Sequence, residues 1–272
     1  MSRQRWWHWL RTIRDNPVYR REKGEWGSPN PFYEKLTRYS PFLVIGAIVL
    51  GLCAGSTSNT ALLAGNDELF VFWCLLCLPG MLLSMLTIFA TFMAPALTAP
   101  AVSLEIDRGT WDILRMTPQP TGAILLAKLL GALARLRIWL LLFLLSLFQG
   151  LLITCVSAVS GGELGLWGMA LGISTIFRPW VEILFAAFLG MFVSTWVRSA
   201  TLALVGTYVG ILVIKFFNNS VLWLGIGSGV FGVESNSMFV SGTVGPVVVY
   251  MLLLPVLALG IVWRAEKIGV ES

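Results

Sequence analysis

A charged segment at residues 104–118 carries the side chains best suited to binding chemistry. Acidic residues and arginines alternate there with large apolar groups, and the residues that we expect to bind are Glu105, Asp107, Arg108, Gly109, Thr110, Trp111, Asp112 and Leu114. An aromatic anchor among carboxylates and a guanidinium suits insertion into a groove on a soluble protein. The same pattern also suits a helix that dips into the lipid headgroups, so the residues alone leave both interpretations open.

Local signals predict a short helix within this segment. Thr110 is a suitable N-cap, and Asp112 would lie in the first turn, near the positive end of the helix dipole. Thr117 and Pro118 are expected to end the helix. The apolar side chains of such a helix, Trp111 first among them, would need a cover from outside it.

Two patterns that resemble catalytic or nucleotide-binding motifs each lack an essential group. Residues 122–129 resemble a phosphate loop, but Ala127 and Leu129 stand where the second glycine and the magnesium-binding hydroxyl are needed. The glycine-rich turn at 225–229 resembles that of a serine hydrolase, but the only histidine is His8, which we expect on the other side of the membrane. We therefore expect no catalytic, metal or cofactor site in this chain.

The composition indicates which elements must position the charged segment. Hydrophobic residues make up 57% of the chain and charged residues 12%, and the mean hydropathy is +0.80. These values are too apolar for a soluble domain, so we predict an all-α integral membrane protein. With roughly 20 residues per crossing, the chain has room for about six or seven membrane helices.

Apolar runs predict six spans within a transmembrane domain at residues 41–264. The spans are expected at about 42–60, 69–97, 136–155, 180–197, 201–217 and 244–263. Residues 166–177 are apolar but too short to cross, and Arg178 and Pro179 interrupt them, which predicts an interfacial or re-entrant helix at the outer face. Residues 218–243 are too rich in Gly, Ser and Asn for a regular crossing.

Basic residues predict the orientation of these spans. The amino-terminal region, the loop at 104–122, the turn at Arg198 and the tail at 265–272 lie on one side, where Lys and Arg are concentrated. The segments expected on the other side, near 60–68, 156–178 and 218–243, contain Arg178 as their only Lys or Arg. Because basic loops stay in the cytoplasm, both termini and the charged segment are expected there.

Residues 1–40 are predicted to form a cytoplasmic, interfacial region. They hold nine Lys or Arg against four Asp or Glu, and Trp6, Trp9, Leu10 and Ile13 have the spacing of one helical face. This is the pattern of an amphipathic helix on a membrane surface. A simpler interpretation is that the aromatic and basic residues only anchor the chain at the headgroups.

Arg178 and Glu182 are candidates for a charged pair at the outer face. They are four residues apart, so on a helix they can pair with each other. The alternative is a role in an outer gate or in substrate contact. Lys215, near the outer end of the fifth span, is expected to extend to the outer surface.

The charged segment and its flanks resemble the coupling segment of ABC transporter permeases of the type-2 family. The matching residues are Pro95, Ala99, Ala101, Glu105, Asp107, Arg108, Gly109, Thr110, Trp111, Asp112, Leu114, Thr117, Pro118 and Lys128. Ile106 departs from the pattern, which more often has a charged residue there, and Arg137 lies unusually deep. Outside residues 95–128 the resemblance is one of architecture alone.

The resemblance implies a half-transporter of the cell membrane, the inner or plasma membrane of a prokaryote, that exports a substrate. A separate ABC ATPase subunit would bind the coupling helix between the second and third spans and would hold ATP and magnesium. A second permease subunit, identical or different, would complete a dimer. The chain itself would be no enzyme, would contact the lipid bilayer and would bind no nucleic acid.

Two other functions remain open at this point. One is a transport-inactive protein of the same architecture that serves in membrane assembly or regulation. The other is a secondary carrier driven by an ion gradient, which should have ionisable groups near the middle of its spans. The spans hold few such groups, which favours the transporter subunit.

Overall fold

The computed structural model describes residues 15–24, 38–39, 41–42, 45–46, 67–117, 119–136, 138–160, 162–231 and 236–268. Helices are the regular elements throughout these ranges, which confirms the all-α class for this part of the chain. Most of the predicted interfacial region at 1–40 and of the predicted first span at 42–60 lies outside the described residues, as does the end of the tail.

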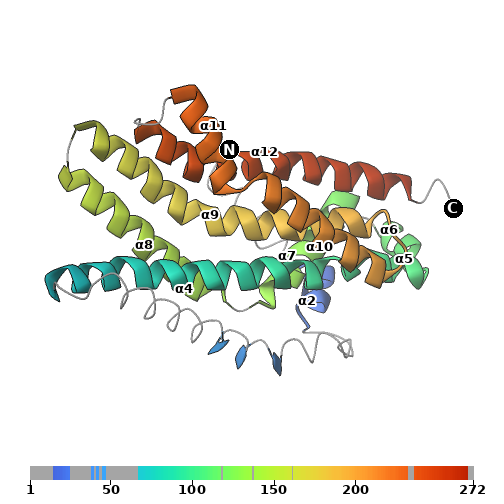
Figure 1. The fold of residues 1–272 in the computed structure, drawn as a ribbon. Helices are drawn as coiled ribbons and strands as arrows, with labels where there is room; N and C mark the ends of the chain where they lie inside the picture. The colour runs from blue at the N-terminus through green and yellow to red at the C-terminus, as the bar shows by residue number, and fades with distance from the viewer. Residues whose placement is uncertain are drawn as a thin grey trace, which may run out of the picture.

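Five stretches of the described residues are long and apolar enough to cross a membrane. They are carried by α4 (Asp67–Thr98) with α5 (Pro100–Asp107), α8 (Trp139–Ser160), α9 (Gly162–Ser194), α10 (Ala200–Phe217) with α11 (Ser220–Phe231), and α12 (Asn236–Lys267). The long helices run side by side, with α5 at one end of the molecule (Figure 1). They cover five of the six predicted spans and give the chain the helices of a multi-pass membrane protein.

The helix α9 differs from the prediction at residues 166–177. The interfacial or re-entrant helix expected there is wrong, because α9 continues through Arg178 and Pro179. Neighbouring helices can compensate for the backbone hydrogen bond that a proline removes from a membrane helix, and Glu182 compensates the charge of Arg178 one turn later. Arg178 and Glu182 therefore lie near the middle of α9, whereas the sequence placed them at the outer end of a span.

Close packing against α8 keeps the first half of α9 in line with the second half. Gly150 of α8 and Gly172 of α9 face each other, and a Cβ on either would lie 2.7 Å from the carbonyl oxygen of the other. A side chain at Gly168 would collide with Ser157 of α8. Small residues let membrane helices approach closely and gain van der Waals contact, so these glycines join α8 to α9.

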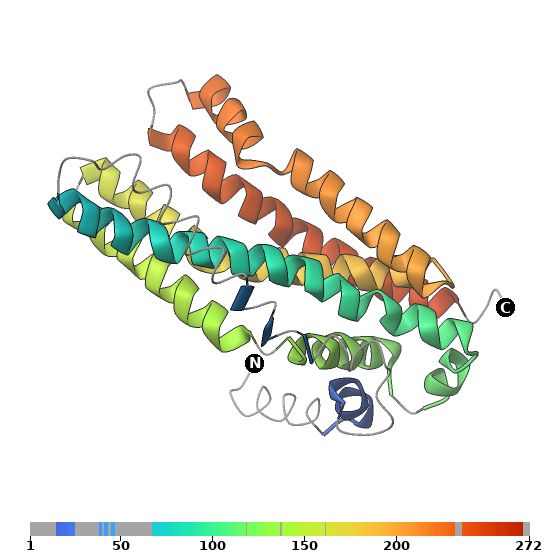
Figure 2. The same ribbon diagram turned by 60° about the horizontal axis from the view of Figure 1, so that its bottom comes forward.

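The apolar stretch that follows residue 123 forms two helices. The first, α7 (Thr121–Ala134), is too short to cross, and α8 begins at Trp139. The Trp139 Nε1 donates to the carbonyl oxygen of Leu133 at 2.8 Å, which holds the end of α7 beside the start of α8. The helix α7 also packs on α2 (Pro17–Lys23), and both lie on one side of the long helices (Figure 2).

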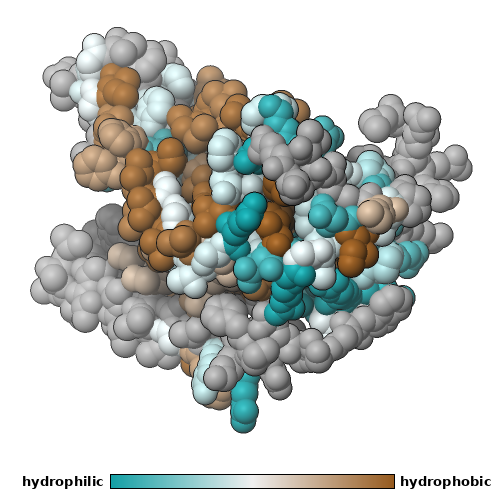
Figure 3. Space-filling model, turned by 90° about the vertical axis from the view of Figure 1, so that its right-hand side faces the viewer, coloured by the Kyte–Doolittle hydropathy of each residue, from teal (hydrophilic) through white to brown (hydrophobic). Residues whose placement is uncertain are grey.

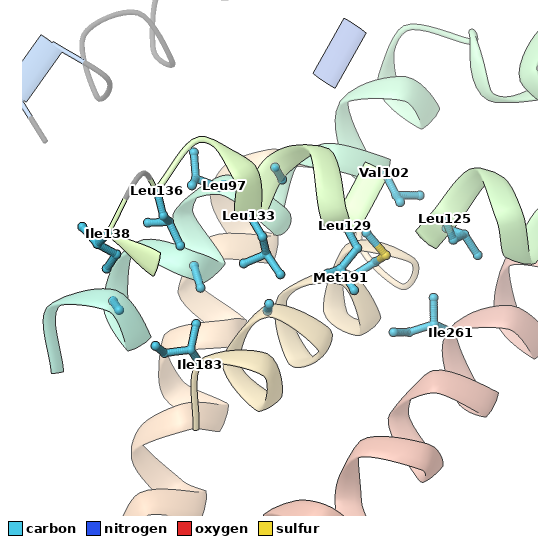
Figure 4. Packing of buried hydrophobic residues seen from close by; sticks show 14 of the residues in the cluster. Leu97, Val102, Leu125, Leu129, Leu133, Leu136, Ile138, Ile183, Met191 and Ile261 are labelled. Carbon is cyan, nitrogen blue, oxygen red and sulfur yellow. The ribbon is translucent and has the colours of Figure 1, made fainter. Parts of the chain in front are cut away.

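The main apolar cluster lies where α4, α5, α7, α9 and α12 meet. Leu125, Leu129 and Leu133 of α7 are buried in it against Met191 of α9 and Ile261 of α12 (Figure 4). Burial of these side chains stabilises the attachment of α7 through the hydrophobic effect. A helix that is too short to span is therefore firmly attached to the bundle, next to the charged segment.

Candidate functional site

The charged segment folds as two short helices joined by a tight turn. The first helix, α5, ends at Asp107, and the second, α6, covers Trp111–Arg115. Gly109 in the turn has a φ of +67°, in the left-handed region that glycine adopts without a steric penalty. The Thr110 N–H donates to the carbonyl oxygen of Glu105 at 2.9 Å and closes the turn.

Thr110 does not cap α6 in the predicted way. Its backbone angles are helical (φ −88°, ψ −8°), and α6, which lies within the described residues, has no side-chain hydrogen bond at its cap. The Thr110 hydroxyl donates instead to the carboxylate of Glu105. Asp112 lies in the first turn of α6 as predicted, and the helix ends at Arg115, two residues before Thr117.

Trp111 is covered by the chain itself, so the expectation that it needs a cover from a partner or from lipid is wrong. Its side chain is 2% exposed and belongs to the main apolar cluster, against which Leu114 also packs. Ile113 and Met116 face outward instead, with 66% and 85% of their surface exposed. The sequence pattern could not distinguish these two faces, because a helix of five residues is too short to show a periodicity.

The polar residues of the turn form the exposed part of the segment. Asp107, Arg108, Gly109 and Asp112 are exposed, and hydrophilic residues gather at this end of the molecule (Figure 3). Beside α6 lies a hollow of about 280 Å³ that reaches Arg198 and the end of α12. Of the other predicted site residues, Glu105 and Trp111 are buried, and Thr110 and Leu114 are half-buried.

Glu105 belongs to an ionic cluster, which consists of Arg21, Glu22, Glu105 and Lys128; Glu105 and Lys128 are buried, and Arg21 is exposed. The Lys128 Nζ donates at 3.1 Å to Glu105, to Glu22 and to the carbonyl oxygen of Ala101. The Arg21 Nη2 donates to the same Glu105 oxygen, Oε1, at 2.5 Å. The cluster joins α5, α7 and α2, and its two acids balance its two bases.

Lys128 is the central residue of the ionic cluster. An ammonium group has three donors, and each has an acceptor here, which is what a lysine that is 1% exposed requires. The sequence placed Lys128 near the headgroups and gave no sign of its partners on α2. The chain brings Glu22 to Lys128 across a separation of 106 residues, which no local pattern reveals.

A second group of charges lies in the membrane part of the bundle, and we call it the membrane triad: Arg178, Glu182 and Lys215. The Arg178 Nε donates to Glu182 Oε1 at 3.0 Å, and the Lys215 Nζ donates to Glu182 Oε2 at 3.1 Å. The prediction that Lys215 extends to the outer surface is therefore wrong, because the lysine turns from α10 to α9. All three residues line a cavity of about 450 Å³ between α4, α8, α9, α10 and α12.

No protein-family model matches the chain, and neither a curated protein nor a solved structure is similar to it. The resemblance of residues 95–128 to type-2 ABC permeases therefore remains a hypothesis drawn from the residue pattern. Within the described ranges, no three His, Cys, Asp or Glu side chains converge as metal ligands would. The charged segment and the membrane triad are the two arrangements from which function can be inferred.

Proposed function

We propose that the chain is the membrane-spanning permease subunit of an ATP-driven ABC exporter, with α5 and α6 as its coupling segment. In this proposal a separate ATPase subunit binds the segment on the cytoplasmic face and a second permease subunit completes the transporter. One observation carries it: the segment is held rigidly from inside by the ionic cluster and presents Ile113 and Met116 outward.

Rigidity matters because a coupling segment has to transmit movement. Ala99 donates its N–H to the carbonyl oxygen of Pro95 at 2.8 Å and has helical backbone angles, so the chain stays helical from α4 into α5 although Pro100 has no N–H to donate. On the far side of α5, the ionic cluster fixes Glu105 to α7. A push on α6 would therefore reach both the helix before the segment and the helix after it.

The exposed residues suit a protein partner. Ile113 and Met116 offer apolar contact, and Asp107, Arg108 and Asp112 offer polar contacts of both signs. An apolar centre with charged neighbours is the usual composition of a protein interface. Trp111 is buried in the main apolar cluster, so it would not touch the partner but would hold α6 in position.

Association with the ATPase subunit tests this proposal. We expect Ile113→Glu combined with Asp112→Lys to abolish co-purification with a co-expressed ABC ATPase subunit, because an apolar contact is lost and a charge is reversed. The matched control is Glu266→Lys, which reverses an exposed carboxylate on α12 at the same end of the molecule. Unchanged association of the double variant, or an equal loss in the control, would contradict the proposed coupling role.

The membrane triad favours a second candidate, the ion-coupled carrier. A carrier needs ionisable groups at mid-depth, and Lys215 joins Arg178 and Glu182 near the middle of α9 although it lies 33 residues beyond Glu182 in the sequence. Transport into sealed vesicles separates the two candidates. The exporter requires ATP and its partner subunit, whereas the carrier works without ATP and stops when the ion gradient is collapsed.

A further inference from the structure

The cavity that contains the membrane triad has the composition of a binding site for a polar group. Its volume of about 450 Å³ is in the range of small-molecule sites. Besides the triad, its lining includes the polar residues Ser84, Thr87, Gln149, Ser174, Thr175 and Thr243. Leu83, Ile88 and Ile153 also line it, so the cavity offers both polar and apolar contacts within an apolar bundle.

The triad holds two basic groups and one acid. Arg178 and Lys215 are basic, and Glu182 is the one carboxylate among the described residues that line the cavity. An anion bound in the cavity would accept a charge-assisted hydrogen bond from the Lys215 ammonium group. Glu182 also accepts only one of the three donors of the Lys215 ammonium group, and that side chain is 29% exposed.

The cavity is accessible along α4 and α10. Ser84 and Ile88 of α4 line it and are exposed, Ile88 to 42%. The outer face of α10 beside Lys215 is apolar and exposed, with Leu212 at 56% and Phe216 at 74%. An acyl chain could remain against this face while an acidic headgroup entered the cavity.

We propose that this cavity binds a singly charged anionic headgroup, a phosphate or carboxylate, next to Lys215 and Arg178. A role of this cavity in holding a transported substrate rests on the proposed function. Binding of the anion itself does not depend on the proposed function. A negatively charged lipid and a free anion share this chemistry, and the exposed apolar face of α10 favours the lipid.

The experiment compares the lipids retained by the purified full-length chain in native mass spectrometry. In equal mixtures of phosphatidylglycerol and phosphatidylcholine, we expect the protein to retain the anionic lipid preferentially. Lys215→Met should lower this preference about tenfold, because a hydrogen bond to a charged group is lost. The matched control is Lys23→Met, the same substitution at an exposed lysine of α2, which should leave the preference unchanged.

A second variant distinguishes binding from a structural role. Glu182→Gln raises the net charge of the cavity, so we expect it to strengthen retention of the anionic lipid while it removes both ion pairs. Ser84→Phe, which fills the entrance and keeps the triad, should weaken retention. If Lys215→Met retains the anionic lipid like the wild type, or if Glu182→Gln loses it as Lys215→Met does, the proposal is overturned.

A titration with inorganic phosphate separates the two sources of an anion. Displacement of the retained lipid by phosphate at low concentration identifies a free anion as a sufficient ligand, and resistance to phosphate identifies the lipid; either result supports the site. Binding of neither anion overturns it. Because this assay contains no ATPase subunit, its failure leaves the association test of the proposed function unaffected.

Discussion

The ionic cluster at Lys128 and the membrane triad at Glu182 are both built around a buried glutamate, yet they differ in balance and in surroundings. In the ionic cluster two acids meet two bases, and Lys128 is 1% exposed with an acceptor for each donor. In the triad two bases share one acid, beside a cavity of about 450 Å³. A balanced cluster in a packed region stabilises a fold, whereas an unbalanced one beside a cavity can receive a ligand.

The largest effect is expected at Lys128. Lys128→Met would leave Glu105 and Glu22 without their ammonium partner, and breaking a buried ion pair in this way costs about 3–5 kcal/mol. We expect the free energy of unfolding in detergent to fall by that amount. Adding Glu22→Gln should recover part of the loss, because Glu105 keeps Arg21 as a partner whereas Glu22 loses Lys128. A loss as small as that of Lys215→Met would contradict the comparison.

An intermediate effect is expected at the contact between α8 and α9. Gly150→Ala would place a Cβ against Ile176 and 2.7 Å from the Gly172 carbonyl oxygen, so α8 and α9 must separate. Overpacking of this kind costs about 1–3 kcal/mol, measurable by the same unfolding experiment. Gly225→Ala is the control, because a Cβ there meets open space. Equal stability of the two variants would show that this contact does not hold α9 straight.

The smallest effect on stability is expected at Lys215. Its ammonium group is partly exposed at the cavity, and pairs of that kind contribute about 1 kcal/mol or less. Lys215→Met should therefore change the unfolding free energy little, even though it reduces binding of the anionic lipid. If Lys215→Met lowered the unfolding free energy by several kcal/mol, the triad would stabilise the fold as the ionic cluster does, and the comparison would be contradicted.

Much of the helical framework could be predicted from the sequence. The helices at 201–217 and 244–263 follow from the lengths of apolar runs and from the charges at their ends. The prediction failed at residues 166–177, where a proline and an arginine indicated a break. The missing information was the packing of Gly150 on Gly172, which keeps α9 against α8; the pairing of Arg178 with Glu182 was predicted, but its consequence for the helix was not.

The candidate site was predicted in position but not in its internal arrangement. The sequence located the charged segment, its short helix and the first-turn position of Asp112. It did not reveal that Trp111 is buried or that the Thr110 hydroxyl donates to Glu105, because both depend on groups outside α6. The consequence for function is specific: the exposed apolar residues available to a partner are Ile113 and Met116.

Composition and the order of apolar runs, by themselves, determined the class of the protein and the location of its one charged segment between spans. Only the tertiary structure decided which charges meet. Lys128 finds Glu22 across 106 residues, and Lys215 finds Glu182 across 33. The physical reason is that a charge inside an apolar bundle must find a partner wherever the packing of helices brings one within reach, and sequence spacing carries that information only for residues on the same helix.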